Sequence, residues 1–171
     1  MQIQANRCTL RALEPSDIEL LYLWENDPEV WHVSGTLAPI SRERLARFIE
    51  EQSYDIYATK QMRLIVDVEG IAVGSIDIFD FDPLNNRFGI GILIYGDENR
   101  RHGYAHMAIE AIKEYARNTL FVNQIWASVA EDNVASLMLF RRCGFKVCGV
   151  RKAWLRRKEN YISEIELQCL L

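Results

Sequence analysis

The sequence has little of the features that define several classes of protein. Its 171 residues include four cysteines, four prolines and nine glycines, too few for a disulfide-rich, proline-rich or collagen-like chain. No apolar run approaches the roughly 20 residues that cross a bilayer. The opening MQIQANRCTLRAL lacks the charged and apolar regions of a secretory signal, and no repeat or flexible linker divides the chain. We therefore expect a single cytoplasmic domain over residues 1–171, without membrane association.

The few cysteines show no pattern typical of a disulfide framework or a metal site. They are Cys8, Cys143, Cys148 and Cys169. Because they form no CxxC pair and stand among apolar residues, we predict reduced cysteines packed in the interior. His102 and His106 lie four residues apart where a helix is predicted to begin, without a third ligand type nearby in the sequence. We predict solvated histidines there and no metal ion.

An excess of basic residues is also missing. Lys and Arg number 20 against 24 Asp and Glu, for a net charge of −4 and a pI of about 5.5. This balance excludes a general nucleic-acid-binding protein. The charge is uneven, because residues 1–96 carry 15 acidic and 8 basic side chains, whereas residues 97–171 carry 9 and 12. Two ligands of opposite charge and scattered solvated charge both remain open as interpretations.

What the sequence does contain is an alternation of strand and helix patterns. Hydrophobic residues make up 49%, enough for a core. Period-two alternation and short apolar runs predict strands over residues 8–12, 63–68, 73–81, 88–95, 125–130, 145–155 and 161–170. Helical spacing predicts helices over residues 18–26, from residue 41, over 103–120 and over 133–143. The order β-α-α-β-β-β-α-β-α-β-β indicates an α/β (α+β) domain with a mixed sheet of about six to seven strands.

The stretch DENRRHGYA, residues 97–105, lies between a predicted buried strand and a predicted amphipathic helix. Backbone N–H groups at the beginning of a helix lack intrahelical partners, and the helix dipole is positive there. Gly103 allows a bulky anion to approach, and Arg100 and Arg101 add positive charge. Two interpretations explain these features equally well: a pyrophosphate site, and a basic loop with an ordinary glycine turn. Without a Walker A loop or a GxGxxG fingerprint, kinase and dehydrogenase chemistry is not indicated.

Two motifs resemble those of a known family. Arg100-x-x-Gly103-x-Ala105 is similar to the acyl-CoA motif, Gln/Arg-x-x-Gly-x-Gly/Ala, of the GNAT superfamily of N-acetyltransferases. The segment NVASLMLFRRCGF, residues 133–145, is similar to the second motif of that family, an Asn-capped helix that ends in Gly-Phe. The opening LRALEPSD, residues 10–17, resembles the ribosomal-protein alanine and spermidine (diamine) acetyltransferase branches. The resemblance covers practically the whole chain.

This resemblance implies the GNAT fold, with acetyl-CoA as the acetyl donor. In the family, acyl-CoA lies in a V-shaped opening between the fourth and fifth strands. Its pyrophosphate meets backbone amides of the first motif, and its pantetheine arm lies along the fourth strand like an added strand. The implied cofactor-binding residues are Leu93, Ile94, Tyr95, Arg100, Arg101, His102, Gly103, Tyr104, Ala105, Asn133 and Ser136. A helix N-cap also explains Asn133, and we expect both roles together.

The resemblance further implies direct attack of an amine on the thioester, without a covalent enzyme intermediate. Many members of the family place a Tyr in the second motif as the acid and a Glu on the fourth strand as the base. This sequence has Phe140 in the first position and no carboxylate over residues 87–95. The acid and base are therefore unassigned. Our candidates are Asp80, Tyr95, Glu131 and Tyr161, beside Asp82 and Asp132, for which turn and helix-cap roles are open alternatives.

The acidic first part of the chain favours a cationic acceptor, which would be a polyamine or diamine or a protein N-terminus. We expect acceptor contacts from Glu25, Asp77 and Asp80, and from Trp31, which is predicted in a loop after a proline. Trp24 is predicted to pack in the core. A second hypothesis is a catalytically weak CoA-binding or regulatory protein with the GNAT fold, since the usual acid and base are missing. The apolar final strands leave a homodimer or higher oligomer open.

Overall fold

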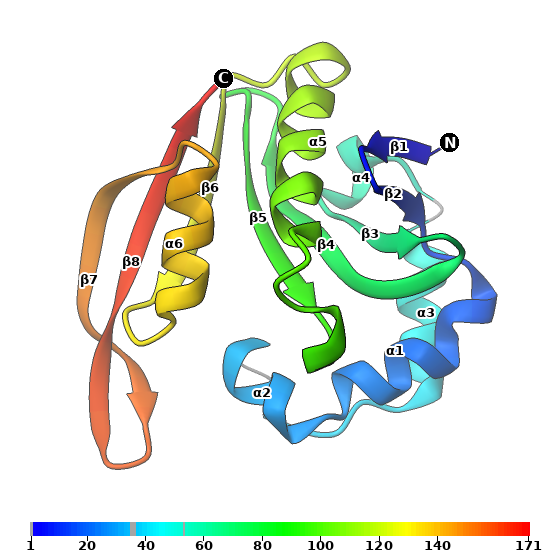
Figure 1. Ribbon diagram of the computed structural model, residues 1–171, viewed down its shortest axis with the longest axis horizontal. Coiled ribbons are helices and arrows are strands. Elements are labelled where there is room, and N and C mark those ends of the chain that lie inside the picture. Colours follow the sequence, from blue (N-terminus) through cyan, green and yellow to red (C-terminus); the bar gives the residue numbers. More distant parts are fainter. Residues whose placement is uncertain (1, 35–36, 53) are drawn as a thin grey trace.

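An eight-stranded mixed sheet forms the centre of the structure, a computed structural model that describes residues 2–34, 37–52 and 54–171 (Figure 1). The strands lie in the order β1-β2-β3-β4-β5-β6-β8-β7. Neighbours are antiparallel except β5 and β6, which are parallel. The bounds are β1 Gln2–Ala5, β2 Cys8–Ala12, β3 Met62–Val68, β4 Ile71–Asp82, β5 Arg87–Ile94, β6 Gln124–Ala130, β7 Lys146–Arg157 and β8 Asn160–Leu170.

Helices pack on both faces of this sheet. On one face α5 and α6 lie over the larger hydrophobic core, and on the other face α1 and α3 lie over a smaller core. Short 3-10 helices, Pro15–Asp17 and Asp97–Asn99, precede α1 and the loop before α5. The bounds are α1 Ile18–Glu25, α2 Pro28–Ser34, α3 Arg42–Glu51, α4 Ile56–Thr59, α5 Tyr104–Asn118 and α6 Val134–Arg142.

The predicted order of elements is confirmed, but the sheet has eight strands instead of six to seven. The additional strand is β1, which pairs with β2 from Gln2↔Arg11 to Ala5↔Cys8. Its sequence, QIQA, is short and mostly polar, so it carries a weak strand signal. The single turn α4 was also not predicted, and it begins where Asp55 accepts hydrogen bonds from two backbone N–H groups.

The prediction of a loop after Pro28 is wrong. Pro28 begins α2, because a proline at the first helical position loses no intrahelical hydrogen bond. Asp27 Oδ1 accepts a hydrogen bond from Glu29 N at 2.9 Å, which satisfies one of the first donors of the helix. Trp31 therefore lies on a helix, and its Nε1 donates to the carbonyl of Glu25 at 2.7 Å.

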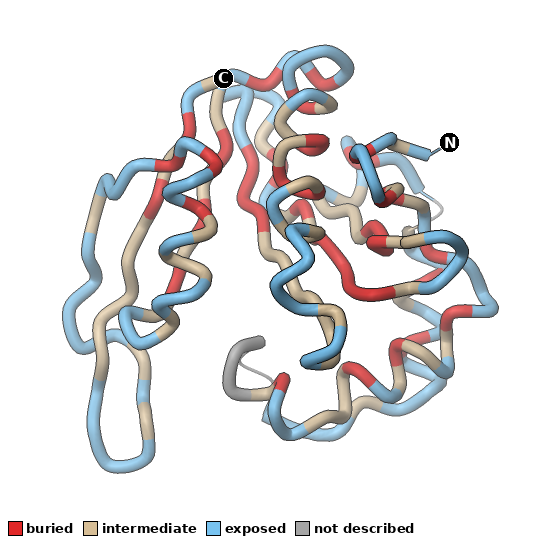
Figure 2. Tube along the Cα trace, in the orientation of Figure 1, coloured by how far each residue is buried: buried red, intermediate tan, exposed pale blue. Residues whose placement is uncertain are grey.

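The two cores follow from the period-two alternation of the central strands. On β3, Leu64 and Val66 pack into the larger core and Ile65 packs into the smaller one. Figure 2 shows buried residues along the central strands and on the side of α5 that faces the sheet. Trp24 is 4% exposed in the smaller core, in agreement with its predicted packing role. Each fully buried aliphatic side chain contributes about 1.5–3 kcal/mol.

The parallel strands β5 and β6 separate part of the way along their length (Figure 1). Their paired residues run from Arg87↔Gln124 to Gly89↔Trp126. Beyond this point β5 continues against β4, and β6 continues against β8. Gly89 lies under the edge-to-face pair of Phe79 and Trp126, where an added Cβ would come within 2.4 Å of Phe79. The strands thus open toward their carboxyl ends, where α/β sheets bind ligands.

Candidate active site

The loop between β5 and α5 forms a cradle of backbone N–H groups. Arg101 and Gly103 have positive φ angles of 66° and 84°, which turn the chain sharply before the helix. Among the described residues, no backbone carbonyl accepts a hydrogen bond from the N–H groups of residues 101–106. The first helical bond runs from Met107 N to Gly103 O at 3.0 Å. Unpaired donors at the positive end of a helix dipole can bind a pyrophosphate.

Three arginines surround this cradle, and one of them was not predicted. Arg100 Nη1 contacts Asp97 Oδ1 at 2.6 Å, and Arg101 is exposed. Arg7, in the turn between β1 and β2, donates a hydrogen bond from Nη2 to the carbonyl of His102 at 2.7 Å. Because 95 residues separate Arg7 from His102, no local pattern could have indicated this contact. Arg7 holds the loop and adds a third positive charge next to it.

The side chains of the cradle residues pack against the loop. The rings of His102 and Tyr104 stack with centroids 5.5 Å apart, and His102 Nε2 lies 3.0 Å from the carbonyl of Glu98. Ala105 is half-buried in the first turn of α5. His102, Tyr104 and Arg7 therefore contact and support the backbone of the predicted motif.

The end of β5 forms one wall of the opening between the strands. Leu93 and Ile94 are half-buried and pair with β4, whereas β6 has already separated from them. Tyr95 N donates to Val73 O at 2.9 Å, and its hydroxyl donates to Asp27 Oδ2 at 3.0 Å. A strand edge of this kind can accept an extended pantetheine arm as an additional strand.

The opposite wall comes from β6 and α6. Asn133 caps α6, and its side chain accepts a hydrogen bond from Ser136 N at 3.1 Å. The expected cap role of Asn133 is thus present, and its contact with the cofactor stays a prediction. Phe140 is 3% exposed and packs edge-on against Phe145, with ring centroids 5.1 Å apart.

The four catalytic candidates do not form one cluster. Tyr95 follows β5 and Glu131 follows β6, so these two flank the opening from opposite strands. Glu131 Oε1 accepts a hydrogen bond from Ser163 N at 2.6 Å.

The other two candidates are exposed. Asp80, with a φ of 50°, lies near the paired end of β5 and β6. Tyr161 is 63% exposed and lies near the tip of the β7–β8 hairpin. The turn role of Asp82 is present, since its carboxylate accepts hydrogen bonds from Leu84 N and Asn85 N. The cap of α6 is Asn133 and not Asp132, which contacts Arg157 at 3.1 Å.

Two of the predicted acceptor-binding carboxylates meet at one guanidinium. Arg63 Nε contacts Asp77 Oδ1 at 2.5 Å, and its Nη1 contacts Glu25. The three side chains come from β3, β4 and the end of α1. Arg63 and Asp77 line a cavity of about 230 Å³, together with Phe48, Gln52, Gln61, Met62, Ile78, Phe79 and Gly91. Gln52 Nε2 is buried there without a hydrogen-bond partner among the described residues.

A larger cavity of about 490 Å³ lies beyond Phe79, on the same open face of the sheet. Arg87 contacts Asp82 at 3.3 Å there, with Asp80 nearby. Arg151 contacts Glu164 at 3.1 Å and also binds Glu166. The cavity is lined by Asp80, Asp82, Arg87, Gln124, Trp126, Cys148, Arg151, Glu166, Leu167 and Gln168. Phe79 and Trp126 separate it from the smaller cavity.

The cysteines are all free, and three of the four are buried as predicted. Cys148 is exposed on β7, so the prediction of packing is wrong there. Cys143 follows α6 and lies near His106 and Glu110 of α5. Burial, followed by the nearby Glu110 carboxylate, raises the pKa of the Cys143 thiol to about 12.

Comparisons with known proteins agree with this geometry. The model of the acetyltransferase (GNAT) domain matches residues 7–146. An uncharacterized N-acetyltransferase p20 of Bacillus licheniformis is 26% identical, over 94% of this chain and 91% of its own. The spermidine N-acetyltransferase of Vibrio cholerae, solved with CoA and spermine, superposes with a TM-score of 0.85 at 21% identity, over 96% of this chain and 95% of that one. RimL, a ribosomal L7/L12 alpha-N-protein acetyltransferase solved with CoA, gives a TM-score of 0.85 at 17% identity, over 100% and 98%.

A sheet that opens between two parallel strands, beside an anion cradle, is the arrangement of an acyl-CoA-binding transferase. The chain belongs to the GNAT acetyltransferase family and is an acetyl-CoA-dependent N-acetyltransferase. In the described part of the chain, no helix combines the length and apolarity that a bilayer crossing requires.

Proposed function

We propose that the protein acetylates a primary amine of a cationic acceptor, with a polyamine or diamine as the first candidate and a protein N-terminus as the second. The observation that carries this proposal is the charge of the open sheet face. Arg63, Arg87 and Arg151 each stand beside two carboxylates. Each group has one more negative than positive charge, so the face attracts a cation with several charges.

The aromatic residues between these groups favour a polyamine. Phe79 and Trp126 lie between the two cavities, and carboxylates lie on either side of them. A polyamine alternates ammonium groups with apolar methylene chains, and aromatic faces bind both the methylenes and the cations. The likeness to the Vibrio cholerae enzyme solved with spermine supports this choice, whereas the likeness to RimL supports a protein N-terminus.

The donor side of the proposal rests on the cradle and the two walls of the opening. The N–H groups of residues 101–106 hold the pyrophosphate, helped by Arg100, Arg101 and Arg7. Backbone groups of residues 93–95 hold the pantetheine arm, and Asn133 and Ser136 contact the cofactor from α6. Acetyl-CoA, when bound, supplies an activated thioester carbonyl. The cradle fits this group because its donors have no backbone acceptors among the described residues.

The positions and hydrogen bonds of the candidate side chains indicate which of them can take or give a proton. The acceptor must lose a proton before it attacks, and Glu131 is our first candidate to take it, since it directly follows β6, one of the two strands that separate. The Tyr95 hydroxyl is already committed to Asp27. Phe140 has no proton to give, but a thiolate whose conjugate acid has a pKa near ~8.5 leaves with little acid assistance.

An acceptor panel tests the proposal. Purified protein is incubated with acetyl-CoA and spermidine, spermine, diamines, peptides with free N-termini or amino sugars, and the release of free thiol is followed. We expect turnover with the polyamines. Glu25→Gln and Glu166→Gln should raise the KM for spermidine by about three- to tenfold with little change in kcat. Each variant removes an attraction that acts equally on the bound substrate and on the transition state.

The alternative, a catalytically weak CoA-binding or regulatory protein, gives a different result in the same panel. It would bind CoA in calorimetry and release no thiol above the uncatalysed rate with any amine. Turnover with N-terminal peptides and none with polyamines would select the second acceptor class. Unchanged spermidine KM values in both carboxylate variants would remove the acidic face from the proposal.

A further inference from the structure

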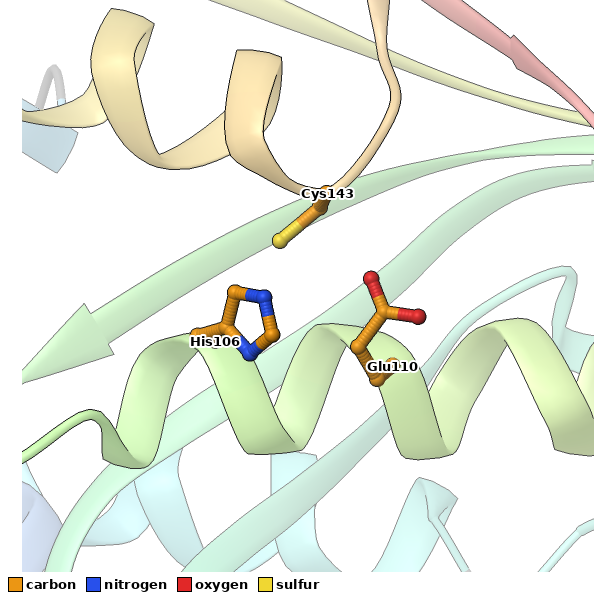
Figure 3. A group of neighbouring side chains, drawn as sticks. All are labelled: His106, Glu110 and Cys143. Atoms are coloured by element: carbon orange, nitrogen blue, oxygen red, sulfur yellow. The ribbon is translucent and has the colours of Figure 1, made fainter.

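Three side chains with different metal-binding atoms meet between α5 and α6. His106 and Glu110 are one turn apart on α5, and Cys143 follows the last turn of α6 (Figure 3). The imidazole nitrogen, the carboxylate oxygen and the thiol sulfur all lie within 4.8 Å of one another. The sequence pattern indicated no third ligand type near the two histidines. Cys143 is 37 residues from His106 in the sequence, so no local pattern connects the two.

The position of this group is suited to an ion that is bound from the solvent. Cys143 is 1% exposed, Glu110 is half-buried and His106 is exposed. The buried thiol lies at the inner end, and the histidine, which can rotate, lies at the mouth. Ligand atoms around a tetrahedral Zn²⁺ are about 3.5 Å apart, given bonds of about 2.0–2.3 Å. The ligand atoms, which lie within 4.8 Å of one another, would have to approach by up to about 1.3 Å, and rotation of the exposed imidazole can supply the part of this movement that involves His106.

Lys113 orients the carboxylate of this group. Its ammonium donates to Glu110 Oε1 at 2.9 Å and to Oε2 at 3.0 Å, and also to the carbonyl of Cys143 at 2.8 Å. The ammonium thus joins the end of α6 to α5 and fixes Glu110 toward Cys143. Lys113 contacts both oxygens of Glu110, so on binding a metal Glu110 would give one oxygen to the ion and keep the other on Lys113, a usual outer-shell arrangement.

We propose that His106, Glu110 and Cys143 bind a Zn²⁺ ion that joins α5 to α6, with a water molecule as the fourth ligand. Sulfur and imidazole ligands select Zn²⁺ over Mg²⁺ or Ca²⁺, which prefer oxygen ligands. On binding, the thiol loses its proton to solvent and the thiolate sulfur forms the bond to zinc, so no redox partner is required. The ion would join the far end of the helix that Asn133 caps to the first turns of α5, next to the cradle.

Metal titration of the full chain tests this site. After treatment with EDTA and its removal, Zn²⁺ is titrated against a chromogenic chelator. We expect one ion per chain with a Kd of about 10 µM or lower, and binding at least tenfold weaker in both His106→Ala and Cys143→Ser. Co²⁺ used as a substitute probe should give the thiolate-to-metal absorption band in the wild type and in Cys148→Ser, and lose it in Cys143→Ser.

The controls separate this site from adventitious binding. Cys148 is the exposed cysteine and His102 the neighbouring exposed histidine, so Cys148→Ser and His102→Ala should keep wild-type zinc affinity. His106→Ala changes an exposed side chain and keeps the proposal testable if Cys143→Ser does not fold. The proposal is overturned if His106→Ala binds Zn²⁺ as tightly as the wild type, or if the Co²⁺ band depends on Cys148.

Discussion

The hydroxyl of Tyr95 donates a hydrogen bond to Asp27 Oδ2 at 3.0 Å, across 68 residues of sequence. The Tyr95 ring also stacks on Trp24 with centroids 5.5 Å apart. Asp27 caps α2 at the same time, through Glu29 N. Since Tyr95 comes immediately after β5 and shortly before the cradle loop, these contacts fix the beginning of that loop relative to the α1–α2 corner.

We expect Tyr95→Phe to affect stability more than catalysis. The loss of one hydrogen bond should lower the free energy of unfolding by about 1 kcal/mol. The hydrogen bond to Asp27 raises the pKa of Tyr95, so the wild-type hydroxyl stays protonated to a higher pH than an ordinary tyrosine does. Urea unfolding measures the first effect, and kcat, measured against pH, should stay within about threefold of the wild type.

The opposite pattern would assign a catalytic role to Tyr95. A fall in kcat of about a hundredfold or more, with loss of the basic limb of the pH profile, would identify its hydroxyl as the acid. Asp27→Asn is the matched variant, because its Oδ1 can still accept from Glu29 N and its Nδ2 can donate to the Tyr95 oxygen, which then accepts. It should therefore be nearly as stable as the wild type.

The cradle gives a second prediction through Gly103. Both Gly103→Asn and Gly103→Glu place a residue with a side chain in the left-handed region of φ. The cost in stability is about 1–2 kcal/mol for Glu and smaller for Asn. Only the glutamate places a negative charge among the N–H donors, so it should weaken CoA binding at least about tenfold more than Asn does. Isothermal titration calorimetry with CoA measures the difference.

Gly70 offers a matched control for that experiment. It has a φ of 85° and open space around an added Cβ, and it lies in the turn between β3 and β4, outside the cradle residues 101–106. Gly70→Glu should cost similar backbone strain and leave CoA affinity unchanged. Wild-type CoA affinity in Gly103→Glu would mean that the pyrophosphate binds elsewhere.

The parts of the site that the sequence could predict are those made by neighbours in the chain. The cradle depends on Gly103 and on the beginning of an amphipathic helix, both visible within a few residues. Long-range contacts left no such signal. Arg7 reaches His102 across 95 residues, and Arg63 joins Glu25 to Asp77 from three separate elements.

The same limit applies to the fold. Strong periodicity predicted the central strands and α5, because burial on one face imposes a period on the residues. The short β1, α2 and α4 depend on turn and cap chemistry, where a residue such as Pro28 can end one helix or begin the next. Their existence is decided by packing, which a local pattern does not contain.

Phe140 provides a third prediction, because it occupies the position where many members of the family have the tyrosine that acts as the acid. Since the acid role is vacant, Phe140→Tyr should leave kcat nearly unchanged. The side chain is 3% exposed against Phe145, so the added hydroxyl is buried and should cost about 1–3 kcal/mol. Thermal unfolding should show a lower Tm, whereas Phe121→Tyr, at a residue 76% exposed, should not. A tenfold rise in kcat at wild-type Tm would instead show that this position reaches the thiol.

Asp17 determines a fourth prediction, the acid sensitivity of the fold. It is 6% exposed, and Arg11 donates to its two oxygens at 2.8 and 2.9 Å while Glu14 N donates at 2.9 Å. Burial acts to raise the pKa of Asp17, but the hydrogen bonds from Arg11 and Glu14 N outweigh it and lower the pKa below its usual value. The unfolded chain therefore takes up this proton first as the pH falls.

The stabilisation from Asp17 is thus present above its ordinary pKa, near 4, and is lost as the pH falls through the lower folded pKa. Asp17→Asn should be about 2–4 kcal/mol less stable than the wild type at pH 7, because it leaves Arg11 without its main partner. The gap should narrow between pH 5 and pH 3, as measured by urea unfolding. Glu43→Gln, which breaks an exposed ion pair with Arg47, should change stability by less than about 1 kcal/mol at both pH values. A constant gap for Asp17→Asn from pH 7 to pH 3 would show that Asp17 stabilises the fold by packing and not by its charge.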